Sequence, residues 1–166
     1  MAVKPKAKTR HDCTMTVPVT APVQAPDTQA HVLSVRVYWE DTDAGGIVYY
    51  ANYLRYAERA RSELLRVLGV TSQRALADET GLVFAVRRFE ADYLASARLD
   101  DVLDVETQVI AVHGAAVDME QIVRRDRCDL VRMKVQIACV NDRGRATRLP
   151  DWLAQAFAGY VRGTQD

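Results

Sequence analysis

Apolar and polar positions follow two different periods along this chain. From Asn52 to Leu68 the apolar residues recur every three or four positions, the period of an α-helix with one buried face. The residues of that face are Tyr53, Ala57, Ala60, Leu64 and Leu68. Mostly charged residues occupy the opposite positions, and Gly69 follows as a suitable C-terminal stop. The pattern predicts one long amphipathic helix.

Beyond this helix the apolar positions alternate with polar ones by two, as in strands with one buried face. The alternating runs lie at about 88–93, 103–111, 117–124 and 131–139, and a valine-rich and aromatic run lies at 32–39. Turn-forming residues separate the later runs, which predicts consecutive hairpins. A last short helix, at about 151–161, follows Pro150, which suits its first position.

The order of these elements predicts an α+β fold. Strand, long helix, four strands and short C-terminal helix are best packed as one antiparallel β-sheet wrapped around one long central helix. Such a sheet has two free edges, so we expect subunits to pair through an edge or a face.

Composition separates an N-terminal extension from this domain. The chain has 166 residues, enough for one domain. Residues 1–30 are rich in Thr, Pro, Ala and Gln and contain no aromatic residue, so we expect a disordered extension there and the folded domain at 31–166. Lys+Arg and Asp+Glu are both 22, and this balance argues against a nucleic-acid partner. No apolar stretch is long enough for a membrane-spanning helix.

Few residues could support metal or triad chemistry. The three cysteines form no C-x-x-C pair, which indicates no zinc site and fits a reducing, cytoplasmic compartment. Three histidines are too few for a His-based metal site, and the common phosphate-loop, dinucleotide and serine-hydrolase motifs are absent. We therefore expect no metal and no cofactor.

The candidate chemistry lies in the run Asp41-Thr-Asp-Ala-Gly-Gly46, between the first strand and the long helix. As a plain connector, it uses Asp for turns and Gly for positive φ. A calcium loop is excluded because the twelfth position, Asn52, is not Glu. A third interpretation is a catalytic carboxylate beside the unpaired N–H groups of a helix N-terminus, which can hold an oxyanion. Spacing alone does not decide between connector and catalyst.

A longer motif decides between the connector and the catalytic interpretation. The run VRVYWEDTDAGGIVYYANYLRYAERAR, residues 35–61, resembles the signature of the hotdog-fold thioesterases. It is most similar to the acyl-CoA thioesterases encoded beside the Tol-Pal system, and similar to 4-hydroxybenzoyl-CoA thioesterase. The run YLASARLDD, residues 93–101, follows the family's Y-x-x-P-A-R-L-D-D pattern with Ser96 in place of Pro. The resemblance covers about residues 32–160.

The resemblance implies a site and an assembly. The catalytic aspartate corresponds to Asp43, acting as nucleophile or general base, and the backbone N–H that polarises the thioester carbonyl corresponds to Tyr50. The Tol-Pal-linked enzymes usually carry His at the position of Tyr50, but a backbone donor does not depend on the side chain. The other candidates for substrate binding or support of the site are Gly45, Gly46, Ile47, Val48, Tyr49, Tyr53 and Glu58. The family is usually tetrameric, built from edge-paired dimers.

Two alternatives to an acyl-CoA thioesterase stay open. A hotdog dehydratase would need a His near the helix start, where this chain has Tyr50. A non-enzymatic partner protein in envelope or lipid metabolism is the other, and acyl carrier protein is a further possible thioester donor. The CoA phosphates require cations, for which the candidates are Arg87, Arg88, Arg124, Arg125, Arg127, Arg132 and Lys134.

Overall fold

The computed structural model describes residues 30–161, so all but the last residue of the expected extension 1–30 lies outside the described residues. In chain order the elements are β1 (His31–Arg36), a 3-10 turn (Trp39–Asp41), α1 (Asn52–Val67), α2 (Gln73–Thr80), β2 (Leu82–Tyr93), β3 (Val102–Val112), β4 (Ala116–Arg125), β5 (Cys128–Asn141) and α3 (Asp151–Ala158).

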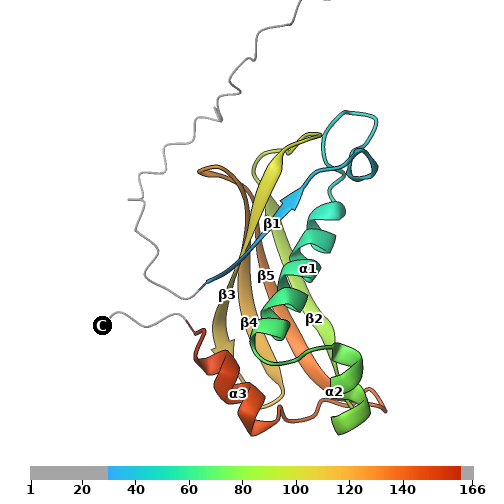
Figure 1. Cartoon of the computed structure of the whole chain (residues 1–166), viewed down its shortest axis with the longest axis vertical. Helices are drawn as coiled ribbons and strands as arrows, with labels where there is room; N and C mark the ends of the chain where they lie inside the picture. The colour runs from blue at the N-terminus through green and yellow to red at the C-terminus, as the bar shows by residue number, and fades with distance from the viewer. Residues whose placement is uncertain (1–29, 162–166) are drawn as a thin grey trace, which may run out of the picture.

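The strands form one antiparallel sheet with the order β1-β3-β4-β5-β2. Figure 1 shows α1 lying along the curved sheet, with the loop that precedes it at the upper end and both α2 and α3 at the lower end. This arrangement confirms the predicted α+β fold with a sheet around one long helix. No helix within residues 30–161 is long and apolar enough to cross a membrane.

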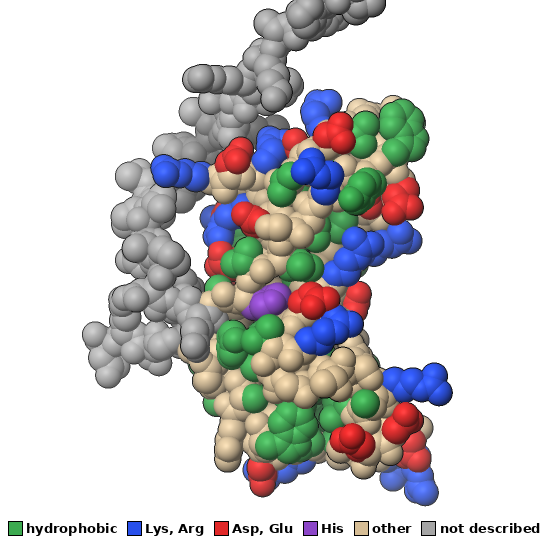
Figure 2. Space-filling model, in the orientation of Figure 1, with side chains coloured by type: hydrophobic (Ala, Val, Ile, Leu, Met, Phe, Trp, Pro, Cys, Tyr) green, Lys and Arg blue, Asp and Glu red, His purple; other side chains and the backbone are tan. Residues whose placement is uncertain are grey.

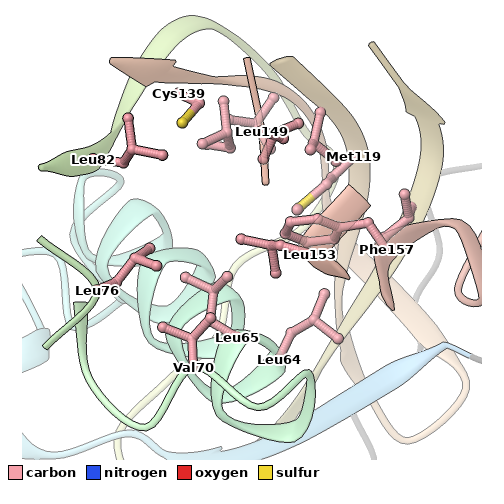
Figure 3. Packing of buried hydrophobic residues seen from close by; sticks show 14 residues of the cluster. Leu64, Leu65, Val70, Leu76, Leu82, Met119, Cys139, Leu149, Leu153 and Phe157 are labelled. Carbon is pink, nitrogen blue, oxygen red and sulfur yellow. The ribbon is translucent and has the colours of Figure 1, made fainter. Parts of the chain in front are cut away.

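The core lies between α1 and the inward face of the sheet. Around the first half of α1, Tyr53 and Tyr56 pack with Leu103 and Val105 of β3. Around its second half, Leu64 and Leu65 join a cluster completed by the sheet and α3 (Figure 3). The three- and four-residue spacing of these helix positions therefore marks the buried face, as predicted.

One element was not predicted. The short helix α2 follows α1 after a tight turn in which Gly69 has φ +95°. Its ends are well defined, because Ser72 Oγ accepts a hydrogen bond from Ala75 N at 2.9 Å and Gly81 adopts a left-handed φ of +69°. The sequence contains both end signals, but eight residues carry too short a periodic pattern to indicate a helix.

Several element boundaries differ from the prediction. β1 ends at Arg36 because the chain turns into the 3-10 segment that contains Trp39. β2 begins at Leu82 and not at about residue 88. A bulge between Val86 and Arg88 interrupts the alternation that identifies a strand, so the first part of β2 was not recognised. Pro150 precedes α3 instead of opening it, since its ψ of 140° is not helical.

Candidate active site

The loop between the 3-10 turn and α1 is held by three hydrogen bonds, two between backbone groups and one from a side chain. Tyr49 N and Asn52 Nδ2 both donate to the carbonyl oxygen of Asp41 at 2.9 Å. Val48 N donates to Ala97 O at 2.9 Å, which ties the loop to the segment after β2. Both ends of the loop are therefore anchored, and its tip has a defined position relative to the start of α1.

Asp43 stands at the tip of this loop with an exposed side chain. Its Oδ1 accepts a hydrogen bond from Gly45 N at 2.8 Å, and its backbone bonds both Gly46 N and Ile47 O at 2.9 Å. A Cβ on Gly45 would lie 3.1 Å from Asp43 Oδ1, and Gly46 has φ +70°. The two glycines thus permit the turn that fixes one carboxylate oxygen and leaves the other outside that hydrogen bond.

The two backbone N–H groups directly before α1 are open. Within residues 30–161, the backbone N–H groups of Tyr50 and Ala51 donate no hydrogen bond. Ala51 has no capping side chain, and the first turn of this 16-residue helix carries no acidic residue. Unpaired amides at the positive end of a helix are suited to stabilising an oxyanion.

Four tyrosines surround this helix start. The ring centroids of Tyr49 and Tyr50 lie 4.6 Å apart, and those of Tyr50 and Tyr93 lie 6.3 Å apart. The Tyr93 hydroxyl donates to Tyr50 O at 3.2 Å, while the Tyr53 hydroxyl accepts from Ala97 N at 2.8 Å. Tyr49, Tyr50 and Tyr93 are exposed and offer surface to a ligand. Tyr53 is only 2% exposed and supports them from the core.

Asp41 stabilises the loop from its buried side. Its buried carboxylate accepts a hydrogen bond from Tyr38 N at 2.8 Å, and its carbonyl oxygen carries the two bonds from Tyr49 and Asn52. Burial, and then the neighbouring Asp41 carboxylate, raises the pKa of Tyr56 well above its usual value. The Tyr56 hydroxyl therefore stays protonated, and Asp41 is a structural residue of the loop.

The structure brings most of the predicted site residues together but separates Glu58 from them. Asp43, Gly45, Gly46, Ile47, Val48, Tyr49 and Tyr50 share the loop, and Tyr53 lies directly beneath it. Glu58 lies further along α1, where its Oε1 accepts a hydrogen bond from Ser62 Oγ at 2.7 Å and its side chain lines a separate cleft.

Most of the candidate phosphate ligands already have acidic partners. Within the described part of the chain, the paired cations are Arg88 (with Glu90), Arg124 (with Glu106 and Asp129), Arg125 (with Asp101), Arg132 (with Asp129) and Lys134 (with Glu120). Only Arg87 and Arg127 of the candidates make no ion pair there. Figure 2 shows acidic and basic side chains interspersed over the face that carries α1.

A buried polar contact between α1 and the sheet was missed. Arg61 donates to Gln121 Oε1 at 2.6 Å, and Gln121 is fully buried. Gln121 occupies an inward position of β4, on the same face of the strand as Val117, Met119 and Val123. A polar residue at an apolar position of the alternation is the signal that could have identified this buried position.

No group of three metal-binding side chains occurs in the part of the chain that is described.

Comparison with known proteins identifies the family. Residues 37–157 match the model of the Thioesterase-like superfamily. The chain is 50% identical to the acyl-CoA thioesterase YbgC of Haemophilus influenzae over 107 residues, which cover 64% of this chain and 78% of the relative. It is 41% identical to the acyl-CoA thioester hydrolase YbgC of Escherichia coli over 108 residues, covering 64% and 79%.

A solved structure is similar over a larger share. The probable thioesterase from Bartonella henselae has a TM-score of 0.69 and 39% identity, covering 73% of this chain and 99% of that one. The fold, the loop that carries Asp43, Gly45 and Gly46, and these matches together define the class: the chain belongs to the thioesterase-like superfamily of hotdog enzymes.

Proposed function

We propose that the protein hydrolyses acyl-CoA thioesters to a free acid and CoA. The observation that carries this proposal is an exposed Asp43 carboxylate on the loop that leads into α1, just before which the Tyr50 and Ala51 amides are unbonded within residues 30–161. The relatives named acyl-CoA thioesterase or thioester hydrolase YbgC supply the substrate class.

The mechanism uses the helix start for polarisation and Asp43 for attack. The thioester oxygen accepts a hydrogen bond from the Tyr50 N–H, and the amide and helix dipole stabilise the negative charge that develops on it. As general base, Asp43 removes a proton from water while the water oxygen attacks the carbonyl carbon. As nucleophile, its carboxylate attacks directly, and water then hydrolyses the anhydride. In both routes the C–S bond breaks and the thiolate leaves as CoA.

Rapid-quench mass spectrometry separates the two routes. Only the nucleophilic route adds the mass of the acyl group to the peptide that contains Asp43 during a single turnover. The general-base route leaves that peptide unmodified at every time point.

The assembly we infer is a tetramer built from edge-paired dimers. In the described residues, β2 pairs only with β5, so its other edge is free. Val83 and Val86 of this edge strand are 40% and 53% exposed. A long free edge with exposed apolar side chains is a natural surface for pairing with a second copy.

Further expectations from the sequence stay predictions: a cytoplasmic location, a link to the Tol-Pal system, and acyl carrier protein as a second donor. The donor is the simplest to test. Thiol release by the full chain is measured with a panel of acyl-CoAs and with the matching acyl-carrier-protein thioesters. Hydrolysis of acyl-CoA supports the proposal, and a protein that cleaves no member of the panel contradicts it and favours a binding role.

A further inference from the structure

A second hollow lies along α1, away from the Asp43 loop. It has a volume of about 130 Å³ and lies between the second half of α1, the start of α2 and the sheet. Its apolar walls include Leu65, Phe84, Met119 and Phe157. Because an engineered apolar cavity of about 150 Å³ binds benzene, this cleft suits a chain of about six carbons or a single ring.

One cation is fixed in this cleft. Arg61 donates to Gln121 Oε1 at 2.6 Å, and Gln121 Nε2 in turn donates to Thr107 Oγ1 at 2.8 Å and to Ala57 O at 2.9 Å. Gln121 and Thr107 are both fully buried, so this network anchors the guanidinium from inside the core.

The Arg61 guanidinium has N–H donors that its bond to Gln121 does not use. Arg61 makes no ion pair within residues 30–161, and an arginine carries five N–H donors. Burial lowers its pKa and the charge of Glu58 opposes that effect, although the group stays charged. A partly buried cation without a carboxylate partner is costly, and an oxygen of a bound ligand would offset that cost.

We propose, on the basis of the thioesterase function above, that this cleft takes the far end of the acyl group. There, Arg61 selects acyl groups that carry a neutral oxygen, as a hydroxyl or a carbonyl. Glu58 lines the same cleft, and its negative charge disfavours a carboxylate on the ligand. A hydroxyl, in contrast, can accept from Arg61 and donate to Glu58.

The acyl group can reach the cleft from two sides. Glu58 lies eight residues after Tyr50, about 12 Å along the helix axis, so the subunit's own thioester reaches the cleft only with a long acyl chain. Phe84 of the free-edged strand β2 also lines the cleft, so a second copy paired at that edge could deliver a short one. The chemistry that Arg61 recognises is the same in both cases.

The test is the selectivity between acyl-CoAs that differ only in a terminal hydroxyl. We compare kcat/KM for 6-hydroxyhexanoyl-CoA with hexanoyl-CoA, and for 12-hydroxydodecanoyl-CoA with dodecanoyl-CoA. The wild type is expected to prefer the hydroxylated member of one pair: the short pair if a second copy delivers the substrate, the long pair if the same subunit does. Arg61→Met should reduce that preference about tenfold, since it leaves the hydroxyl without its donor.

Controls separate this inference from its basis. Arg66→Met, on the exposed side of the same helix, should keep the wild-type preference. The readout is the ratio of the two kcat/KM values within each pair, so a general change in the rate of an Arg61 variant cancels. If Arg61→Met does not fold, as judged by circular dichroism, Arg61→Lys replaces it and should lower the preference partially. An unchanged preference in the Arg61 variants, or a wild type that prefers adipoyl-CoA, overturns this inference alone. A wild type that cleaves no acyl-CoA overturns both proposals.

Discussion

At the scale of single residues, the site depends on how little space the loop leaves around Asp43. The hydrogen bond from Gly45 N holds Asp43 Oδ1 at 2.8 Å, and a side chain on Gly45 would enter the same space. Asp41, two residues earlier, is buried and bonded to the backbone, whereas Asp43 is exposed. The same residue type therefore serves structure at one position and is available for chemistry at the other.

Gly45→Ala tests this close approach. The added Cβ would lie 3.1 Å from Asp43 Oδ1, so the carboxylate must shift by a few tenths of an ångström. We expect kcat to fall by about tenfold with little change in the melting temperature, because orientation of the attacking group is lost. Gly114→Ala is the matched control, since its Cβ meets nothing within 4 Å. Equal kcat values for the two variants would contradict the account.

At the scale of elements, the two helices that follow the loop differ at their N-termini. Ser72 caps α2 through Ala75 N, whereas α1 has Ala51 at its N-cap position and no side-chain cap. Capping groups satisfy the first amides of a helix, and a ligand can do the same. The open end of α1 is therefore consistent with a binding role, and the closed end of α2 with a structural one.

Ser72→Ala should destabilise the fold by about 1 kcal/mol, the usual effect of losing an N-cap. Urea denaturation followed by circular dichroism measures the difference. Thr71→Ala, at the exposed neighbouring position, should change the free energy of unfolding much less. If both substitutions had the same effect, the Ser72 side chain would not be acting as a cap.

Elements were predicted from the sequence where the local period is long. The buried face of α1 follows the helical period, and those of β3 and β5 follow the alternation by two. Leu64, Val105 and Val135, one from each element, are all buried as these periods predict. The helix α2 was missed because it has only eight residues, and the start of β2 because a bulge follows Val86.

The sheet order, and Arg61 as the partner of the inward Gln121, could not be predicted, because they depend on long-range pairing that local periodicity does not encode. For the site, the resemblance of the loop motif to a known family led to the assignment of Asp43 and Tyr50, which stays a prediction. The helical period also predicted that Tyr53 is buried, whereas only the fold could show that Glu58 lies at a different cleft.

At the scale of the whole molecule, the free edge of β2 is the feature that points beyond one chain. Val86 is 53% exposed on this strand. We expect the wild type to form an oligomer in solution. Val86→Lys should lower the mass of the particle in solution, because a charged residue on an edge strand opposes pairing between subunits. Light scattering coupled to gel filtration measures the mass. Val102→Lys, equally apolar and 47% exposed but on a strand paired on both sides, is the control. A monomeric wild type would contradict the predicted assembly.

The central claim is that the Asp43 carboxylate performs the hydrolysis, and Asp43→Asn tests it most directly. The amide keeps the shape of the side chain but can neither attack as a carboxylate nor accept the proton of water. The measurement is kcat/KM for thiol release from the best acyl-CoA substrate, with Asp78→Asn on the exposed face of α2 as control. We predict a loss of at least about 100-fold for Asp43→Asn and none for the control. A variant Asp43→Asn that is folded and retains wild-type kcat/KM would contradict the account.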